Sequence, residues 1–202
     1  ITELVGVLTH TPDVYPNPAV EEVHQQTLLV SYLLATLGFM TAGLLHMIGP
    51  VLGVSYREVR LVLPRMIAAL VFGSVSLPLL QYMVDLANAL TTAFQPEAMG
   101  ATFQEMAGIS ATVVIAYVIN SWLFLLVLIV FLIRAAYIMF AASISPLLAL
   151  GWSLPKIKRY ADSFIAGWVT ALLMAPLDML VLRFMFEMLS GGGTTIGQSV
   201  SN

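Results

Sequence analysis

Long, predominantly apolar runs recur along the chain and dominate its pattern of hydrophobic and polar positions. About 20 apolar residues in a helix cross a hydrocarbon core of about 30 Å. Four runs reach that length and predict membrane-spanning helices, at approximately 27–52, 63–90, 106–133 and 163–186. A fifth run, 135–155, is interrupted by Ser143, Ser145 and Pro146. The pattern predicts an all-α polytopic membrane protein.

The composition excludes an ordinary water-soluble domain. Apolar residues make up 59% of the 202 residues and charged residues only 9%, whereas soluble proteins carry about 45–50% and about 25%. The mean hydropathy is +0.94, so there is too little charge to cover a surface that faces water. The absence of cysteine excludes disulfides and thiolate metal sites.

Basic residues gather at a few places along the chain, and their positions set the expected orientation. Lys and Arg are enriched in the cytoplasmic loops of membrane proteins. The residues expected at the cytoplasmic face are Arg57, Arg60, Arg65, Arg134, Lys156, Lys158 and Arg159. The N-terminal tail, 1–26, contains four acidic residues and no basic one. We therefore expect an integral protein of the cytoplasmic membrane whose N-terminus is extracytoplasmic.

This orientation places both ends of the run 135–155 on the cytoplasmic side. The run then forms a re-entrant or interfacial helical hairpin that turns near Ser145-Pro146, a shape tolerated where protein or water covers the backbone. The alternative is five simple crossings, with the basic cluster at Lys156 outside.

Both ends of the chain differ in composition from the membrane domain, 27–189. Glycines and small polar residues in 190–202 predict a flexible outer tail. The chain starts at Ile1 rather than methionine, and either a cleaved signal peptide or trimming would explain that start.

Polar side chains on the second predicted span share one face. Gln81, Asp85 and Asn88 are spaced i, i+4 and i+7, so they project from the same side of a helix. An ionisable group within a span costs a few kcal/mol or more. This face must therefore point at protein or at water.

The last predicted span contains an acid and a base. Asp178 and Arg183 are about 140° apart around a helix axis, so they do not face each other. A pair between Asp85 and Arg183 fits their charges and their depth. These residues predict either a polar pore wall or ion relay, or a buried pair that fixes how two helices dock.

The remaining polar residues have structural interpretations. Asn120, near the middle of the third predicted span, is expected to hydrogen-bond between helices. The cytoplasmic basic groups are expected to hold the topology and to contact anionic lipid headgroups. Direct contact of these groups with nucleic acid is the weaker interpretation at this charge density.

The sequence contains no catalytic or metal-binding motif. His10, His24 and His46 are scattered, and there is no nucleophile motif or phosphate-binding glycine loop. We expect no enzymatic activity, no metal and no cofactor.

Two stretches together resemble a known family. The first includes Leu63-Pro64-Arg65-Met66, Ser76-Leu77-Pro78-Leu79 and Asp85-Leu86-Ala87-Asn88. The second includes Leu132-Ile133-Arg134-Ala135, Ile144-Ser145-Pro146-Leu147 and Ala175-Pro176-Leu177-Asp178. These stretches share a pattern: an Arg closes a long apolar helix, and a Ser-Pro-Leu turn, a basic link and a final helix with Ala-Pro follow it. The pattern resembles the polytopic inner-membrane subunit of type IV secretion and conjugation machines, including archaeal relatives used for DNA transfer. The resemblance covers roughly 61–189.

The resemblance implies a non-enzymatic channel or assembly platform that acts in several copies. Its implied partners are pilin and other membrane subunits of the apparatus, with ATP hydrolysis supplied by a separate traffic ATPase. The residues carried over are Pro64, Arg65, Pro78, Arg134, Ser145, Pro146 and Pro176. The prolines and Ser145 would mark helix breaks, and Arg134 would cap a span at the cytoplasmic face.

Two other functions remain open from the residues alone. One is a small oligomeric channel or transporter whose polar path includes Asp85, Asp178 and Arg183. The other is a structural subunit that anchors a larger membrane assembly.

Overall fold

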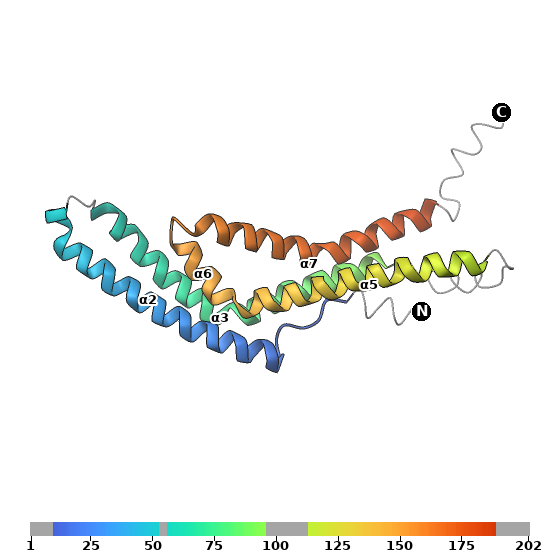
Figure 1. The fold of residues 1–202 in the computed structure, drawn as a ribbon, viewed down its shortest axis with the longest axis horizontal. Coiled ribbons are helices and arrows are strands. Elements are labelled where there is room, and N and C mark those ends of the chain that lie inside the picture. Colours follow the sequence, from blue (N-terminus) through green and yellow to red (C-terminus); the bar gives the residue numbers. More distant parts are fainter. Residues whose placement is uncertain (1–9, 53–55, 96–112, 189–202) are drawn as a thin grey trace, which may run out of the picture. The chain divides into compact units, whose positions relative to one another are not determined.

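The computed structural model describes residues 10–52, 56–95 and 113–188. In this part the chain forms helices only, and they are α2 (Pro18–Leu52), α3 (Tyr56–Phe94), α5 (Val113–Ser143), α6 (Ser145–Ser153) and α7 (Lys158–Glu187) (Figure 1). Internal contacts divide the chain into two compact units. The first unit comprises 1–12, 84–136 and 171–202, and the second comprises 13–83 and 137–170.

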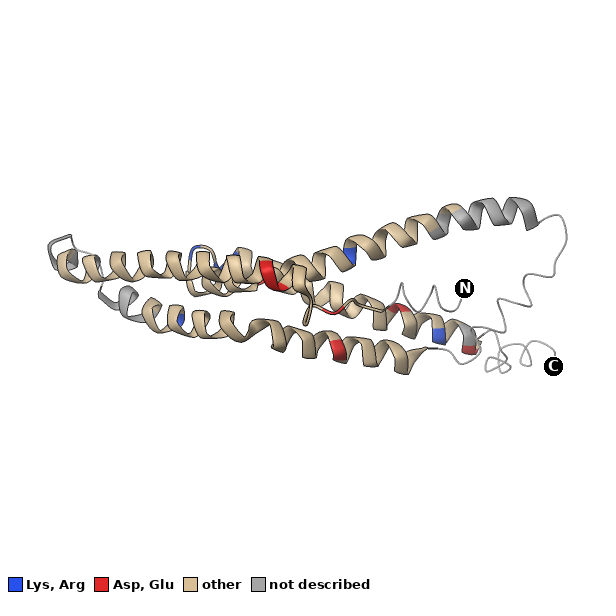
Figure 2. Cartoon of the chain, turned by 90° about the horizontal axis from the view of Figure 1, so that it is seen from below, with Lys and Arg blue, Asp and Glu red and all other residues tan. Residues whose placement is uncertain are grey.

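Four of the described helices are long and apolar enough to cross a membrane. Their candidate spans are Pro18–Ile48, Val62–Phe94, Leu125–Ser143 and Lys158–Met185. Charged residues are sparse along these helices (Figure 2), and large apolar side chains such as Leu29, Leu86 and Phe184 are exposed. Helices that are apolar on all sides are typical of membrane spans. The predicted all-α membrane architecture is confirmed.

The fifth apolar run does not form a separate span. Helix α5 continues past residue 133 to Ser143, and α6 begins at Ser145 after a turn at Ile144. Since α6 has nine residues and a helix rises 1.5 Å per residue, it is about 14 Å long. That is too short to cross the hydrocarbon core, so five simple crossings are wrong. The turn predicted at Ser145-Pro146 is present.

Three of the predicted helix breaks are wrong. Pro64 and Pro78 lie inside α3, and Pro176 lies inside α7. Proline removes one backbone donor and hinders the turn before it, but membrane helices tolerate it where neighbouring groups satisfy the freed carbonyl. Only at Pro146, in the first turn of α6, does a helix begin at the predicted break.

Helix α2 begins earlier than predicted, at Pro18 rather than near residue 27. The side chain of Asn17 accepts a hydrogen bond from the backbone N–H of Ala19 at 3.2 Å, which is the geometry of a helix N-cap. Proline is favoured at the first helical position because its missing N–H would lack a partner there. The residues of the tail from Pro18 onward are therefore helical, whereas 190–202 lie outside the described residues.

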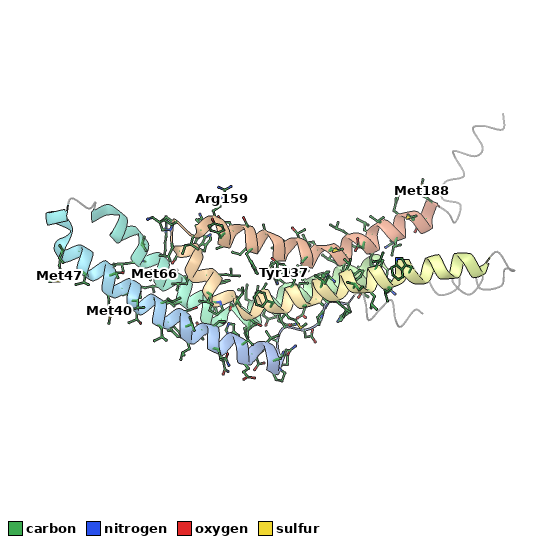
Figure 3. All side chains as sticks on the ribbon, viewed as in Figure 1. Met40, Met47, Met66, Tyr137, Arg159 and Met188 are labelled. Atoms are coloured by element: carbon green, nitrogen blue, oxygen red, sulfur yellow. The ribbon has the colours of Figure 1, made fainter. Side chains whose placement is uncertain are left out.

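In the second unit, α6 packs against α2 and α3. Ala35, Met66 and Leu150 form a buried apolar cluster from these three helices (Figures 1 and 3). The helices approach closely at Gly73, where an added Cβ would lie 3.2 Å from the Cα and Cβ of Pro146. Small residues permit such close contact between membrane helices.

Candidate functional site

Arg134 is a buried cation of the first unit, with only 5% of its surface exposed. Its Nε donates to the carbonyl of Ala171 at 2.6 Å, and its Nη2 donates to the hydroxyl of Thr11 at 2.7 Å. A longer contact of 3.4 Å joins Nη2 to the carbonyl of Leu172. The guanidinium carbon also lies 5.8 Å from the ring centroid of Phe131, within the range of a cation–π contact.

Pro176 explains why α7 offers a carbonyl to Arg134. In a helix the N–H of residue i donates to the carbonyl of residue i−4, so Pro176 leaves the carbonyl of Leu172 without its helical donor. Arg134 supplies a donor to that carbonyl. Asp178, two residues after the proline, is partly buried and attracts Arg134 electrostatically. An arginine on α5 therefore complements both the freed carbonyl and the acid of α7.

Asn88 completes this arrangement from α3. Its Oδ1 accepts from the N–H of Thr11 at 2.9 Å, and its Nδ2 donates to the carbonyl of the same residue at 3.0 Å. Asn88 thus satisfies both backbone groups of Thr11, while Arg134 binds its hydroxyl. We refer to Thr11, Asn88, Arg134, Pro176 and Asp178 as the Arg134 cluster.

The chemistry of the Arg134 cluster suits docking of segments. A guanidinium presents five donors in a rigid planar fork. Here the guanidinium of Arg134, on α5, binds both Thr11 near the N-terminus and the backbone of α7. Removing one partner of a buried charge leaves the others without compensation, so the residues depend on one another. Among the residues that the structure describes, no three His, Cys, Asp or Glu side chains are arranged to hold a metal ion.

Gln81, the first residue of the predicted polar face, binds the N-terminal segment in the second unit. Its Oε1 accepts from the N–H groups of Val14 and Tyr15 at 2.8 and 2.9 Å. Its Nε2 donates to the carboxylate of Asp13 at 3.0 Å. Of the predicted polar face of α3, Gln81 and Asn88 both bind the segment before α2, whereas Asp85 is exposed.

These contacts predict residue-specific changes in amide exchange. Asn88→Ala is expected to accelerate hydrogen exchange at Thr11, whereas Gln81→Ala should accelerate it at Val14 and Tyr15. Loss of the acceptor for the buried N–H of Thr11 costs about 1–3 kcal/mol, which corresponds to roughly 5- to 150-fold in its exchange rate. The bond of Val14 is part-buried and that of Tyr15 is exposed, so smaller accelerations are expected at these two amides. Hydrogen–deuterium exchange read by NMR checks this, with each variant as the other's control. Equal acceleration at all three amides in both variants would contradict the assignment.

A second buried polar group lies in the second unit, where His24, Ser76 and Ser145 form a chain. His24 Nε2 lies 3.0 Å from Ser76 Oγ, which lies 2.7 Å from Ser145 Oγ. Ser145 also donates to the carbonyl of Ala142 at 2.7 Å, the carbonyl that Pro146 leaves without a helical donor. Nearby, Thr27 contacts the carbonyl of Ser143 at 2.6 Å.

The distance between His24 and Ser76 falls within the range of a nucleophile and its base. However, Ser76 is completely buried, and its hydroxyl is shared with the carbonyl of Gly73 and with Ser145. A hydroxyl held in this way joins helices α2, α3 and α6, and such bonds are common between membrane helices. We therefore interpret the hydrogen-bonded group of His24, Ser76 and Ser145 as a contact that packs these helices together.

The structure corrects the predicted role of Arg134. It does not cap a span at the cytoplasmic face, because α5 continues to Ser143 and the candidate span Leu125–Ser143 contains it. The predicted pairing of Asp85 with Arg183 is also not seen between these two described side chains. Arg183 donates instead to the carbonyl of Ala93 at 3.1 Å.

The other predicted residues lie at the surface or outside the described side chains. Asp85 and Arg65 are exposed, as are the basic residues of the link before α7 and its start, Lys156, Lys158 and Arg159. The side chains of Arg57, Arg60 and Asn120 lie outside the described part.

Two signals in the sequence point to polar residues that hydropathy does not single out. The Asn17-Pro18 pair is a helix start, and it places His24 inside α2 rather than in a tail. The prolines at 146 and 176 free carbonyls, and a freed carbonyl in a membrane needs a donor. The side chain of Arg134 is long enough to donate to the carbonyl of Leu172, which Pro176 frees. Ser145 lies next to Pro146 and donates to the carbonyl of Ala142, which Pro146 frees.

Comparison with known families gives a match to nearly the whole chain. A family model described as TrbL/VirB6 plasmid conjugal transfer like protein matches residues 5–202. No curated protein and no solved structure matches the chain.

Proposed function

Because this chain belongs to the TrbL/VirB6 plasmid conjugal transfer-like family, we propose that it forms part of the channel or assembly platform of a type IV secretion or conjugation apparatus. Its four apolar helices make it a multi-pass membrane component. Its proposed role within the apparatus is to hold other subunits in place without catalysing a reaction.

The observation that carries the proposal is the family match over 5–202. The Arg134 cluster supports it, because its polar atoms join the segment near Thr11 to α3, α5 and α7. A junction of this kind gives a membrane subunit a fixed shape on which other chains can assemble. The proposed partners are pilin, other membrane subunits, further copies of this chain and a separate traffic ATPase; a direct contact with nucleic acid is the weaker proposal.

We propose that the N-terminus lies outside the cytoplasmic membrane. With four crossings, the link between α2 and α3 and the link between α6 and α7 then face the cytoplasm. The basic residues other than Arg134 and Arg183 lie at or near these two links, as the positive-inside rule requires.

Cysteine labelling tests this orientation, since the 202 residues contain no cysteine. Lys156→Cys is expected to react with a membrane-impermeant maleimide only after the membrane is opened. Ser199→Cys should react in intact cells, because both the C-terminus and the N-terminus are then outside. Labelling of Lys156→Cys in intact cells would overturn the orientation.

The role in transfer is tested by deletion and complementation in the source cells. Loss of this chain is expected to abolish DNA or protein transfer, and the intact chain should restore it. The second candidate is an independent oligomeric channel that uses Asp85, Asp178 and Arg183. It is favoured if transfer is unaffected and if Asp85→Asn abolishes ion or solute flux through reconstituted vesicles.

A further inference from the structure

The second unit contains an apolar cavity of about 600 Å³ between α3, α5, α6 and α7. This volume lies within the range of about 300–1,000 Å³ found for ligand pockets. Phe72, Leu79, Trp152 and Ile165 line it and are each 42–44% exposed, so the cavity opens to the surroundings of the protein. In a chain that spans a membrane, those surroundings are lipid.

The lining of the cavity selects for a hydrocarbon chain. Its side chains are aliphatic or aromatic apart from Ser145, and its polar groups are the hydroxyl of Ser145 and the indole N–H groups of Trp152 and Trp168. Ser145 Oγ donates to the carbonyl of Ala142, and Trp168 Nε1 donates to the carbonyl of Ile138 at 3.3 Å. A polar ligand would lose its hydration in this cavity and could gain at most the indole N–H of Trp152 at its rim, whereas an acyl chain has no hydration to lose.

The rim of the cavity carries positive charge. Lys158 Nζ lies 5.1 Å from the ring centroid of Trp152, which itself lines the cavity. Lys156 and Arg159 lie within two positions of Lys158 in the sequence and are exposed, and the nearest acid along α7 is Asp162; Figure 3 labels Arg159 at the start of α7. The stretch 156–162 therefore has a net charge of +2, from three basic residues and one acid.

From this juxtaposition we propose that the cavity binds an anionic phospholipid of the surrounding membrane. One acyl chain occupies the cavity, and the phosphate of the headgroup lies against Lys158 with Lys156 and Arg159 around it. The Trp152 ring lies between the two parts of the site and suits the boundary between hydrocarbon and headgroups. This inference is independent of the proposed role in transfer.

Native mass spectrometry of the full-length chain in detergent tests the site. The protein is incubated with phosphatidylglycerol or phosphatidylcholine of identical acyl chains. The wild type is expected to retain phosphatidylglycerol at least fivefold more tightly. Lys158→Gln should weaken that retention about fivefold and leave phosphatidylcholine unchanged, since a basic group at a membrane surface contributes about 1 kcal/mol to binding anionic lipid.

Filling the cavity gives a second, different signature. Ala68 lines the cavity and is exposed, so Ala68→Phe should reduce retention of both lipids severalfold while circular dichroism shows unchanged helix content. Arg183→Gln removes one positive charge from the first unit, and it should leave retention of both lipids as in the wild type.

Three results of these measurements would overturn the proposal, and a fourth comes from competition with the free headgroup. The first is equal retention of the two lipids by the wild type, and the second is an equal effect of Lys158→Gln and Arg183→Gln. The third is unchanged retention in Ala68→Phe, which would place the lipid elsewhere. Glycerophosphoglycerol, the headgroup without chains, should not compete at equal concentration; competition would show a site for soluble phosphate instead of a lipid.

Discussion

Replacing Arg134 with alanine is expected to destabilise the protein by about 3–5 kcal/mol, the range found when one partner of a buried charged group is removed. The substitution leaves the carbonyls of Ala171 and Leu172 and the hydroxyl of Thr11 without the donor seen in the structure. It also leaves the partly buried Asp178 without its electrostatic partner. Reversible unfolding in mixed detergent micelles measures the change in free energy of unfolding.

Three variants distinguish the loss of the Arg134 contacts from the loss of a positive charge as such. Arg183→Gln removes an exposed arginine with one backbone contact, and it should cost less than about 1 kcal/mol. Arg134→Lys should remain destabilised, because an ammonium does not reproduce the planar fork. Pro176→Ala returns a helical donor to the carbonyl of Leu172, so it should recover about 1 kcal/mol in the Arg134→Ala background. Equal effects of Arg134→Ala and Arg183→Gln would contradict the account.

Gly73→Leu should destabilise the second unit by about 1–3 kcal/mol, the usual cost of overpacking. Even a single Cβ at this position would lie 3.2 Å from the Cα of Pro146, so the larger side chain must separate α3 from α6. That movement would also break the contact of 2.7 Å between Ser76 and Ser145, at about 1 kcal/mol more.

Gly43→Leu is the matched control, because a Cβ added at Gly43 meets no other atom within 4 Å. Both variants place the same side chain in a helix of an apolar membrane domain, so the difference between them reports the α3–α6 contact. Unfolding in mixed micelles measures both. If Gly73→Leu is as stable as Gly43→Leu, the close approach at Pro146 does not contribute to stability.

The sequence allowed the membrane architecture to be predicted because length and hydropathy suffice for that purpose. Each span needs about 20 apolar residues, and the runs in this chain are long and separated by polar links. The turn at Ser145-Pro146 was also predictable, because proline suits the first turn of a new helix. The short motifs around Arg134, Ser145 and Pro176 indicated the family that the match over 5–202 confirms.

The position of Arg134 was not predictable from hydropathy alone. A charge that divides two apolar runs looks like the end of a span, and the positive-inside rule then assigns it to the cytoplasm. In the structure, carbonyls of α7, a hydroxyl and a carboxylate compensate the charge, so the helix continues through it. These partners are far away in sequence, which is why no local pattern reveals them.

The sequence predicts that Gln81, Asp85 and Asn88 share one face of α3, but it does not show what lies against that face. Spacing alone places Gln81 and Asn88 on one side of a helix. It does not reveal that the backbone of residues 11–15 lies against them, because a segment without regular secondary structure carries no periodic signal. The bonds to Gln81 and Asn88 are made by backbone groups of this segment, which every residue type except proline carries in full, so they do not depend on its side chains.

The most direct test of the proposed function is a native pull-down of the tagged chain from source membranes in mild detergent, followed by mass spectrometry. We expect a traffic ATPase and pilin-like chains to co-purify with it, and Arg134→Ala should reduce their recovery relative to Arg183→Gln. Recovery of this chain alone, as a homo-oligomer with neither partner, would contradict the role in a conjugation or secretion apparatus and would favour an independent channel.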